Sequence, residues 1–265
     1  MTTSPATSPA DTVGTVLRET VGRVAILTVS NPARRNAMDT RMARLLTDAV
    51  TTAVADGDVG AVVITGEDPA FCAGGNLTEL SDADPARLRA VYEGFLAVAQ
   101  CPLPTIAAVN GPAVGAGLNL ALACDVRLAG PRARFDARFL PLGLHPGGGY
   151  TWMAHRAVGP QVAAALTLFG EVLDAAEAQR VGLVLRAVDD ARAAALEMAT
   201  RAADAPRTLA VTTKATMRVT AHLQAQVDAV EVEVRAQAES VRQDAFRERL
   251  AALQAKIARS DQPND

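Results

Sequence analysis

The sequence predicts an α/β fold that is followed by an all-helical C-terminal region. Three compact, β-rich runs, Val24–Val29, Gly60–Thr65 and Pro104–Val109, are separated by segments with helical periodicity. From residue 206 to residue 257 the strand signal almost disappears, and consecutive helices are expected. We therefore predict three parts, which are a disordered leader over residues 1–12, a core over residues 13–205 and a helical region over residues 206–265.

The first α/β unit lies near the start of the core. Val24–Val29 (VAILTV) predicts a strand, and the turn Asn31–Pro32 ends it. Asp39 is placed to cap an amphipathic helix that reaches about Ala55. The run Gly60–Thr65 (GAVVIT) is almost wholly apolar, so we expect a strand that is buried on both faces of a sheet.

The rest of the core alternates glycine-rich loops with regular elements. In chain order we expect a tight loop at Phe71–Asn76, a helix over 85–100, a buried strand at Pro104–Val109, a Gly/Pro-rich turn at Asn110–Gly117, an apolar helix through Ala123 and short strands at Val126–Ala129 and Arg134–Phe135. A second Gly/Pro loop over 141–149 opens onto helices at Tyr150–Val158, 160–169, 174–181 and 190–203.

Length and composition exclude several classes of protein. The 265 residues are 49% hydrophobic and 21% charged, which is typical of a globular chain that buries a full core. The net charge is −3 and aromatic residues make up only 3%, so we expect no nucleic-acid partner. The two lysines stand against 24 arginines amid abundant alanine, a usage that indicates GC-rich coding and a bacterial source.

The cysteines and histidines favour a cytoplasmic protein without a metal. Cys72, Cys101 and Cys124 are odd in number and form no CxxC pair, so free thiols in a reducing compartment are expected. The three histidines have no metal-ligand spacing, and we predict no metal site. The uncharged stretch Pro104–Cys124 is about as long as a membrane span, but its Gly, Pro and Asn residues favour a strand, a turn and a helix start.

Two short loops could carry chemistry, FCAGGN over 71–76 and NGPAVGAGLN over 110–119. Each follows a buried strand and runs toward a helix start, where backbone N–H groups lack helical partners and carry partial positive charge. One N–H from each loop could bind an oxygen that becomes negative during a reaction. Loss of one such donor typically raises the activation free energy of the reaction by about 2.7–4 kcal/mol. Loop composition alone also fits two ordinary tight turns.

Other nucleotide-binding and hydrolytic motifs are missing from the sequence. Gly115 and Gly117 begin a G-x-G-x-x-G pattern, but Leu120 takes the place of the third glycine, which argues against dinucleotide binding. Neither lysine lies in a phosphate-binding G-x-x-x-x-G-K motif, and none of the six serines lies in G-x-S-x-G.

An ordered set of motifs resembles the enoyl-CoA hydratase/isomerase (crotonase) superfamily. The set runs from about residue 13 to 257 and consists of VAILTVSNPARRNAMD (24–39), AVVITGEDPAFCAGGNLTEL (61–80), PTIAAVNGPAVGAGLNLALACDVRLA (104–129), LPLGLHPGGG (140–149) and AAEAQRVGLV (175–184). The resemblance implies a crotonase-like spiral of β-β-α turns. It also implies a helical C-terminal trimerisation region and assembly into a homotrimer or hexamer.

The same resemblance implies an acyl-CoA ligand, with coenzyme A as part of the substrate and no separate cofactor. The two amides of the oxyanion hole fall at Gly75 and Ala116. The coenzyme and acyl groups are expected to meet Arg35, Ala37, Ala73, Asn76, Leu77, Asn119, Phe139 and Lys256, the last of these through a phosphate.

Two positions depart from the family pattern. Hydratases of the family use a pair of glutamates, which would fall at Asn119 and Phe139. An amide and a phenyl ring cannot transfer protons at neutral pH, so ordinary hydratase activity is not expected. His145 is the most capable remaining candidate for proton transfer, since an imidazole changes charge near neutral pH. The alternative is that His145 is an exposed loop residue without a role in proton transfer.

Two hypotheses of different classes follow. The first is a lyase or isomerase of fatty acid metabolism that acts on a CoA thioester. The second is a non-catalytic acyl-CoA-binding protein that has kept the oxyanion hole and lost the acids. Turnover of a CoA ester above background would distinguish them.

Overall fold

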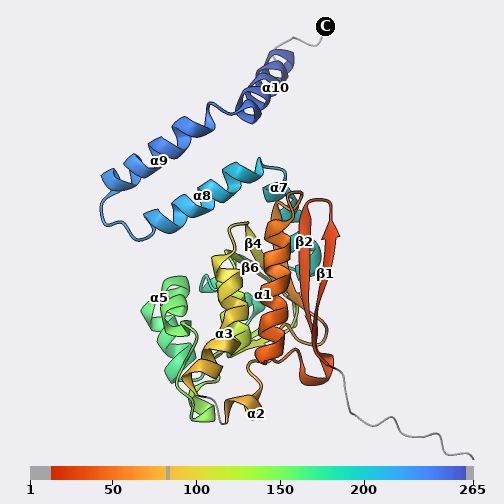
Figure 1. Ribbon diagram of the computed structural model, residues 1–265. Coiled ribbons are helices and arrows are strands. Elements are labelled where there is room, and N and C mark those ends of the chain that lie inside the picture. The colour runs from red at the N-terminus through yellow and green to blue at the C-terminus, as the bar shows by residue number, and fades with distance from the viewer. Residues whose placement is uncertain (1–12, 82–83, 261–265) are drawn as a thin grey trace, which may run out of the picture. The chain divides into compact units, whose positions relative to one another are not determined.

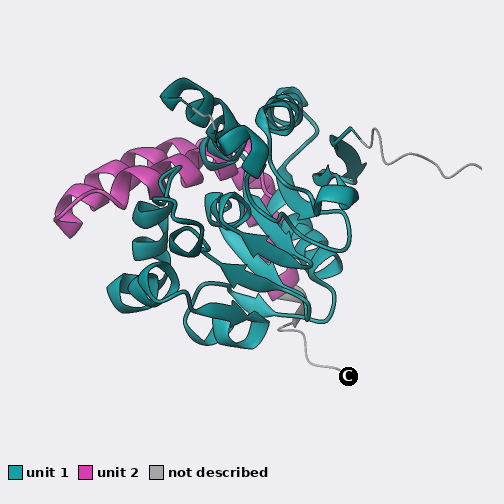
Figure 2. Ribbon diagram, turned by 90° about the horizontal axis from the view of Figure 1, so that it is seen from below, with its two compact units in different colours: residues 1–203 teal, residues 204–265 magenta. Residues whose placement is uncertain are grey.

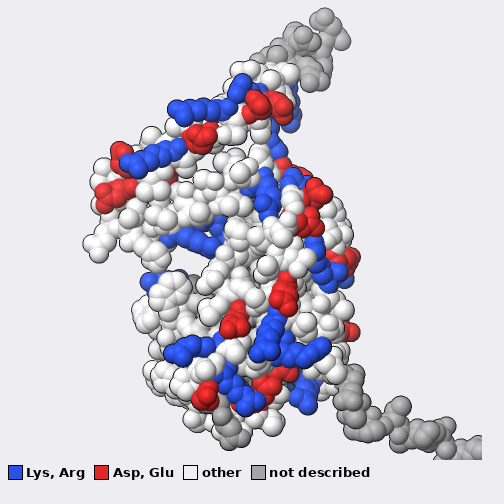
Figure 3. Space-filling view, in the orientation of Figure 1, with Lys and Arg blue, Asp and Glu red and all other residues white. Residues whose placement is uncertain are grey.

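The structure is a computed structural model that describes residues 13–81 and 84–260 (Figure 1). The predicted leader over residues 1–12 lies outside the described residues. Backbone contacts divide the chain into two units, residues 1–203 and residues 204–265 (Figure 2). Positive and negative side chains are intermixed over the face of the protein shown in Figure 3.

The first unit contains two sheets. In the large sheet the strand order is β1-β2-β3-β4-β6-β9, with β1 antiparallel to β2 and the other neighbours parallel. In the small sheet the order is β5-β7-β8, with β5 and β7 parallel and β8 antiparallel. The strands are β1 Thr15–Val21, β2 Val24–Ser30, β3 Ala61–Gly66, β4 Thr105–Val109, β5 Pro112–Val114, β6 Val126–Ala129, β7 Arg134–Asp136, β8 Val172–Asp174 and β9 Arg186–Ala187.

The predicted central strands are confirmed. Every residue of β3 and of β4 is buried, which the apolar runs GAVVIT and PTIAAV indicated. Ile64 pairs with Leu27 on one side and with Ala107 on the other, so β3 is covered by strands at both edges. The predicted short strands that became β6 and β7 are also present.

Four strands were not expected from the sequence. β1 is largely exposed and carries Arg18 and Glu19, so no apolar pattern marks it, and its pairing with β2 defines it instead. β5 lies inside the segment that we expected to be a turn. β8 and β9 are only three and two residues long, and contacts with β7 and β6 define them.

Apart from the short α2, which the sequence did not predict, the helices of the first unit follow the sequence closely. They are α1 Thr40–Ala55, α2 Leu77–Leu80, α3 Pro85–Gln100, α4 Ala116–Ala123, α5 Tyr150–Leu168, α6 Ala175–Arg180 and α7 Ala191–Ala203, with short 3-10 turns at Pro32–Arg34 and Leu140–Leu142. Asp39 caps α1, as expected, by accepting a 2.7 Å hydrogen bond from the Met42 amide. Gly159, with φ 74°, interrupts α5 just before Pro160, in agreement with the two separate helices predicted there.

Small side chains let α7 pack closely on the large sheet. Ala191, Ala195, Ala199 and Ala203 recur every fourth residue, so they form one stripe along the helix, and all four are buried. This stripe joins a cluster with residues of β2, β3, β4 and β6, including Ile26. α1 and α3 pack against each other, and α1 also contacts β1 and β2.

The second unit is helical, as the sequence predicted. It consists of α8 Arg207–Thr220, α9 Gln226–Ser240 and α10 Asp244–Ser260, and α8 contacts α9. Taken by itself, this unit leaves many large apolar side chains exposed. They include Met217, Val227, Val230, Val234, Phe246, Leu250 and Leu253.

Candidate active site

A cavity of about 670 Å³ in the first unit brings together most of the predicted site residues. Its walls come from the loop before α2, the start of α4, one face of α3 and the segment between β7 and α5. Eight of the predicted positions line it, which are Arg35, Ala73, Gly75, Leu77, Ala116, Asn119, Phe139 and His145.

Backbone pairing holds the two glycine-containing loops side by side. The Cys72 amide donates to the Pro112 carbonyl at 3.1 Å, and the Val114 amide donates to the Cys72 carbonyl at 3.0 Å. Gly117 makes this close approach possible, since a Cβ there would lie 2.0 Å from the Cys72 carbonyl oxygen. The loops therefore meet where α4 begins.

One backbone amide of each loop lacks an acceptor in the part of the chain that the structure describes. Met38 donates to the Gly74 carbonyl and accepts from the Asn76 amide, which leaves the Gly75 N–H between them without an acceptor among the described residues. Ala116 is the first residue of α4, so its N–H has no helical partner either. Both residues line the same cavity, and the α4 dipole adds partial positive charge at Ala116.

The two positions where glutamates would fall hold side chains that do not exchange protons. Asn119 is 2% exposed and donates from Nδ2 to the Gly147 carbonyl at 2.9 Å. Its Oδ1 is buried without a hydrogen-bond partner among the described residues. Phe139 is 7% exposed, and its ring centroid lies 5.1 Å from that of Tyr150. Both side chains help to pack the cavity wall.

His145 lines the cavity from an exposed loop position. Its Nδ1 lies 2.7 Å from the Pro146 carbonyl, which can only accept, so the proton of the neutral ring belongs on Nδ1. Nε2 is then left to accept a proton. The structure thus gives His145 a position in the cavity wall, and its role stays a prediction.

Two predicted binding residues of the first unit do not line the cavity. Ala37 donates to the Arg34 carbonyl, and Asn76 caps α2 by accepting from the Thr78 amide. Lys256 lies on α10 in the second unit. Arg35, which does line the cavity, has φ 50°, so a non-glycine residue adopts a left-handed conformation there.

The structure adds residues that the sequence did not single out. Leu88, Val91 and Tyr92 line the cavity from α3, and their i, i+3 and i+4 spacing was the signal that they share one face. A Cβ on Gly147 would lie 2.3 Å from the Tyr92 hydroxyl, so this hydroxyl packs against the glycine loop. Burial raises the pKa of Tyr92.

Charged side chains of the cavity wall come mainly from the region of β7. Arg134, Asp136 and Arg138 line the cavity, and Asp136 accepts from Arg138 Nε at 2.7 Å. The sequence favours a surface or ion-paired strand residue at each of positions 136 and 138, and the ion pair between them is present, with the Asp136 side chain only 8% exposed. Glu79, a further acid near the loops, instead accepts from the amide and hydroxyl of Thr40.

Cys72 is buried beneath the glycine loops, as expected for a thiol that packs like a small apolar group. Burial raises its pKa to about 11, while hydrogen bonds with backbone groups of Gly74 and Met38 partly oppose the shift. A thiol with this pKa is protonated at neutral pH and is a poor nucleophile.

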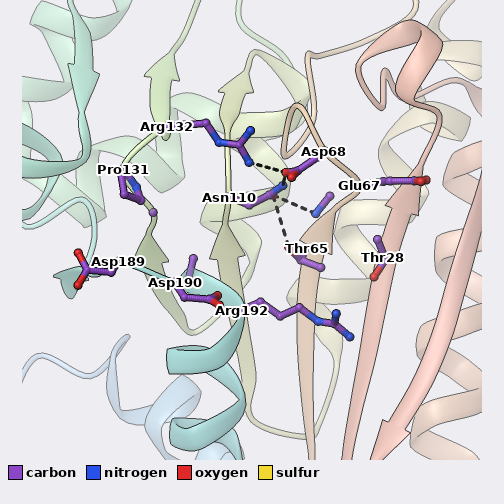
Figure 4. Close-up of a pocket in the computed structure, with 13 residues that line it drawn as sticks. Thr28, Thr65, Glu67, Asp68, Asn110, Pro131, Arg132, Asp189, Asp190 and Arg192 are labelled. Carbon is purple, nitrogen blue, oxygen red and sulfur yellow. Dashed lines mark hydrogen bonds and ion pairs between the residues drawn. The ribbon is translucent and has the colours of Figure 1, made fainter.

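A second cavity, of about 500 Å³, lies at the carboxyl ends of β2, β3 and β4 (Figure 4). Its charged groups are largely satisfied internally. Asp68 accepts from Asn110 Nδ2 at 2.9 Å and pairs with Arg132 at 2.6 Å, and these bonds lower the pKa of Asp68 despite some desolvation. Arg192 pairs with Glu19. This network stabilises the loop ends, whereas the first cavity presents the amides of Gly75 and Ala116.

Neither a membrane span nor a metal cluster is found over residues 13–81 and 84–260. No helix in these ranges combines the length and the apolar composition that a membrane span requires. Within the same part of the chain, no three side chains of the metal-ligating types come close enough to hold an ion together.

Known proteins are similar to this chain in sequence and in fold. The family model described as enoyl-CoA hydratase/isomerase matches residues 19–258. A Mycobacterium tuberculosis protein named a probable enoyl-CoA hydratase is 55% identical over 240 residues, which are 87% of this chain and 94% of that protein. The 2,3-dehydroadipyl-CoA hydratase of Escherichia coli is 41% identical over 61% of this chain and 64% of its own.

A solved structure of a named enoyl-CoA hydratase has a similar fold. The crystal structure of an enoyl-CoA hydratase from Polaromonas sp. JS666 superposes with a TM-score of 0.86 at 29% identity, and the match covers 92% of this chain and 98% of that one. The expected crotonase-like α/β fold is confirmed. The chain therefore belongs to the enoyl-CoA hydratase/isomerase family.

Proposed function

We propose that this protein is an enzyme that binds an acyl-CoA thioester and polarises its carbonyl between the amides of Gly75 and Ala116. The observation that carries the proposal is the pair of N–H groups, one from each loop, that have no acceptor among the described residues and lie in the wall of a single cavity. Fixed amides in a partly buried site stabilise a developing oxyanion more strongly than water does, because they need no reorientation during the reaction.

The cavity wall also suits the rest of such a ligand. Apolar side chains provide a surface for an acyl chain, namely Leu77, Leu80, Leu88, Val91, Leu142 and Leu144. Arg35 adds a positive charge to the cavity wall, and it belongs to the segment 34–37 where the family resemblance places the coenzyme. The phosphate contact of Lys256 is part of the same proposal.

The proposed enzyme is a poor hydratase. Hydration of an enoyl-CoA needs a base for water and an acid at Cα, and each group typically contributes about 10²–10⁴-fold. Asn119 and Phe139 supply neither. The lack of an acid at these two positions also favours the second candidate, a protein that binds acyl-CoA without turnover.

A proline at Ala116 tests the proposal sharply. Ala116 is the first residue of α4, a position where proline fits a helix, so Ala116→Pro removes the N–H with little damage to the fold. We expect acyl-CoA affinity to fall about tenfold, the value of one net hydrogen bond, by calorimetric titration with butyryl-CoA.

Ala116→Gly is the matched control, because it keeps the N–H and removes only a methyl group. Equal affinity of the proline and glycine variants, both folded by circular dichroism, would refute the assigned geometry. An absence of butyryl-CoA binding by the natural protein would refute the proposed function itself.

A further inference from the structure

The cavity contains a single carboxylate among the residues that the structure describes. Its ionisable lining groups are three arginines, one tyrosine, one histidine and Asp136. A carboxylate is well suited to accept a proton from carbon beside a carbonyl that an oxyanion hole has polarised. Asp136 is therefore the candidate for the proton transfer that the side chains of Asn119 and Phe139 cannot perform.

Asp136 lies directly beside the oxyanion loop. In the small sheet Val114 of β5 pairs with Asp136 of β7, and the Gly115 amide donates to the Asp136 carbonyl at 2.9 Å. The next residue, Ala116, supplies one of the two oxyanion amides. Backbone pairing thus fixes the main chain of Asp136 beside the loop that carries the Ala116 N–H, and a catalytic group needs such a fixed support.

The partner of Asp136 is held in an unusual conformation. Arg138 has φ 48°, one of three non-glycine residues with a left-handed backbone in the described part of the chain. From that position its guanidinium turns back onto Asp136, while 55% of the Arg138 side chain remains exposed. Arg35 is another of the three, and it lines the same cavity. Such strain concentrates at functional sites.

Tyr150 is a second neighbour of the carboxylate. Burial raises the pKa of Tyr150, a hydrogen bond with Thr167 opposes the rise, and the charge of Asp136 adds to it. Tyr150 is thus a neutral phenol near Asp136, packed against Phe139.

We propose that Asp136 is the catalytic base that removes a proton from Cα of the bound acyl-CoA. This inference rests on the proposed function, since the amides of Gly75 and Ala116 must first polarise the thioester. The Cα–H bond breaks, its proton passes to the Asp136 carboxylate, and its electron pair forms the Cα=C bond of an enolate whose negative oxygen the amides bind. Return of the proton to Cα regenerates the substrate, and no oxidant or further reactant takes part.

Deuterium exchange in heavy water measures this step without requiring a net reaction. The probe is but-3-enoyl-CoA, whose Cα–H is allylic and therefore acidic, and mass spectrometry follows deuterium at Cα. We expect the natural protein to exchange well above background. Asp136→Asn should lower the rate by about 10²–10⁴-fold and leave the affinity within about threefold. Asp189→Asn is the control, because Asp189 is exposed and lines the other cavity.

Chemical rescue separates a base from a structural residue. Asp136→Ala opens space for a small carboxylate, so added formate should restore part of the exchange in that variant. Rescue also provides an independent measurement if Asp136→Asn does not fold. No rescue in a folded Asp136→Ala variant that binds the probe would overturn the proposal.

Other results would be equally decisive. Exchange that survives Asp136→Asn but is lost in His145→Gln would assign the proton transfer to His145 and overturn the proposal. Tight binding of but-3-enoyl-CoA with no exchange by the natural protein would also overturn it while leaving acyl-CoA binding intact. Failure to bind the probe would instead reject the proposed function on which the inference rests.

Discussion

Single residues decide what this member of the family could do with the acyl-CoA thioester that we propose it binds. At position 119 an amide anchors the glycine loop through the Gly147 carbonyl, and at position 139 a phenyl ring packs on Tyr150. The two side chains therefore contribute packing and loop geometry where a pair of carboxylates would contribute proton transfer. The natural side chains at these two positions change the chemistry that the site can perform, but they leave the backbone amides of the proposed binding mode in place.

Restoring both acids should restore part of the hydratase chemistry. We expect Asn119→Glu combined with Phe139→Glu to hydrate crotonyl-CoA measurably faster than the natural protein, followed as the loss of enoyl absorbance. The gain should be partial, because the new carboxylate at position 119 would face the Gly147 carbonyl and the ring contact with Tyr150 would be lost. Loss of that buried ring should also cost roughly 3 kcal/mol of stability.

The matched control for these acids is Asn119→Gln combined with Phe139→Gln, which has the same shape without the charge. Equal hydration rates in the two double variants would show that the carboxylates do not reach the substrate. Rapid hydration by the natural protein would show that other groups already supply both proton transfers.

The buried thiol of Cys72 should make stability depend on alkaline pH. Because burial raises its pKa from 9.0 to about 11, the folded state holds the proton more tightly than the unfolded state does. The stabilisation is therefore complete below a pH of about 9 and is lost as the pH rises through about 11. The loss amounts to roughly 2–3 kcal/mol of unfolding free energy.

Urea unfolding of the natural protein and of Cys72→Ala between about pH 8 and pH 11 measures this effect. Alanine cannot titrate, so the difference in stability between the two proteins should shrink with rising pH. A constant difference across the range would contradict the raised pKa of the thiol.

At the scale of elements, the site depends on the contact between the loop after β3 and the start of α4. β5 pairs with the segment around Cys72, and Gly117 lets the first turn of α4 rest against the Cys72 carbonyl. The distance between the amides of Gly75 and Ala116 is therefore set by backbone packing.

Gly117→Ala should separate the two loops. The added Cβ would lie 2.0 Å from a backbone oxygen that cannot move aside without shifting the strand pairing. We expect a loss of about 2 kcal/mol or more in unfolding free energy, measured by thermal and urea denaturation, together with weaker acyl-CoA binding. Gly57→Ala is the control, since a Cβ there meets nothing within 4 Å. Wild-type stability and affinity in Gly117→Ala would contradict the close contact.

For the whole molecule, the helices of the C-terminal unit carry a large set of exposed apolar side chains. Val227, Val230 and Val234 recur along α9, and Phe246, Leu250 and Leu253 recur along α10. A monomer seldom leaves apolar stripes of this kind in water, so they favour association. The family resemblance predicts that they pack between subunits.

We expect light scattering to give a mass at least three times that of the 27.5 kDa chain. Val230→Glu combined with Leu253→Glu should shift the protein toward the monomer, because each places a charge within an apolar stripe. Gln237→Glu, an exposed change on α9, should leave the mass unchanged. A natural protein that scatters as a monomer would contradict the predicted trimer or hexamer.

The sequence by itself determined the α/β class, the central strands, the capped helix at Asp39 and the helical C-terminal region. These features depend on local signals, namely apolar runs, capping residues and glycine-rich turns, that each segment carries alone. The ordered motifs also identified the family and predicted where the two oxyanion amides lie. The family resemblance also placed its two glutamates at Asn119 and Phe139, whose side chains cannot transfer protons at neutral pH.

Tertiary structure alone decided which polar groups share the cavity and which strands form from weak patterns. β1 and β8 exist because partner strands supply their hydrogen bonds, and no residue pattern announces such pairing. The sequence left open whether Asp136 is a surface or an ion-paired residue, and only the small sheet shows that it is buried beside Gly115, twenty-one positions away in the chain. Contacts between distant segments cannot be deduced from either segment separately, because burial and pairing depend on what the rest of the chain places around them.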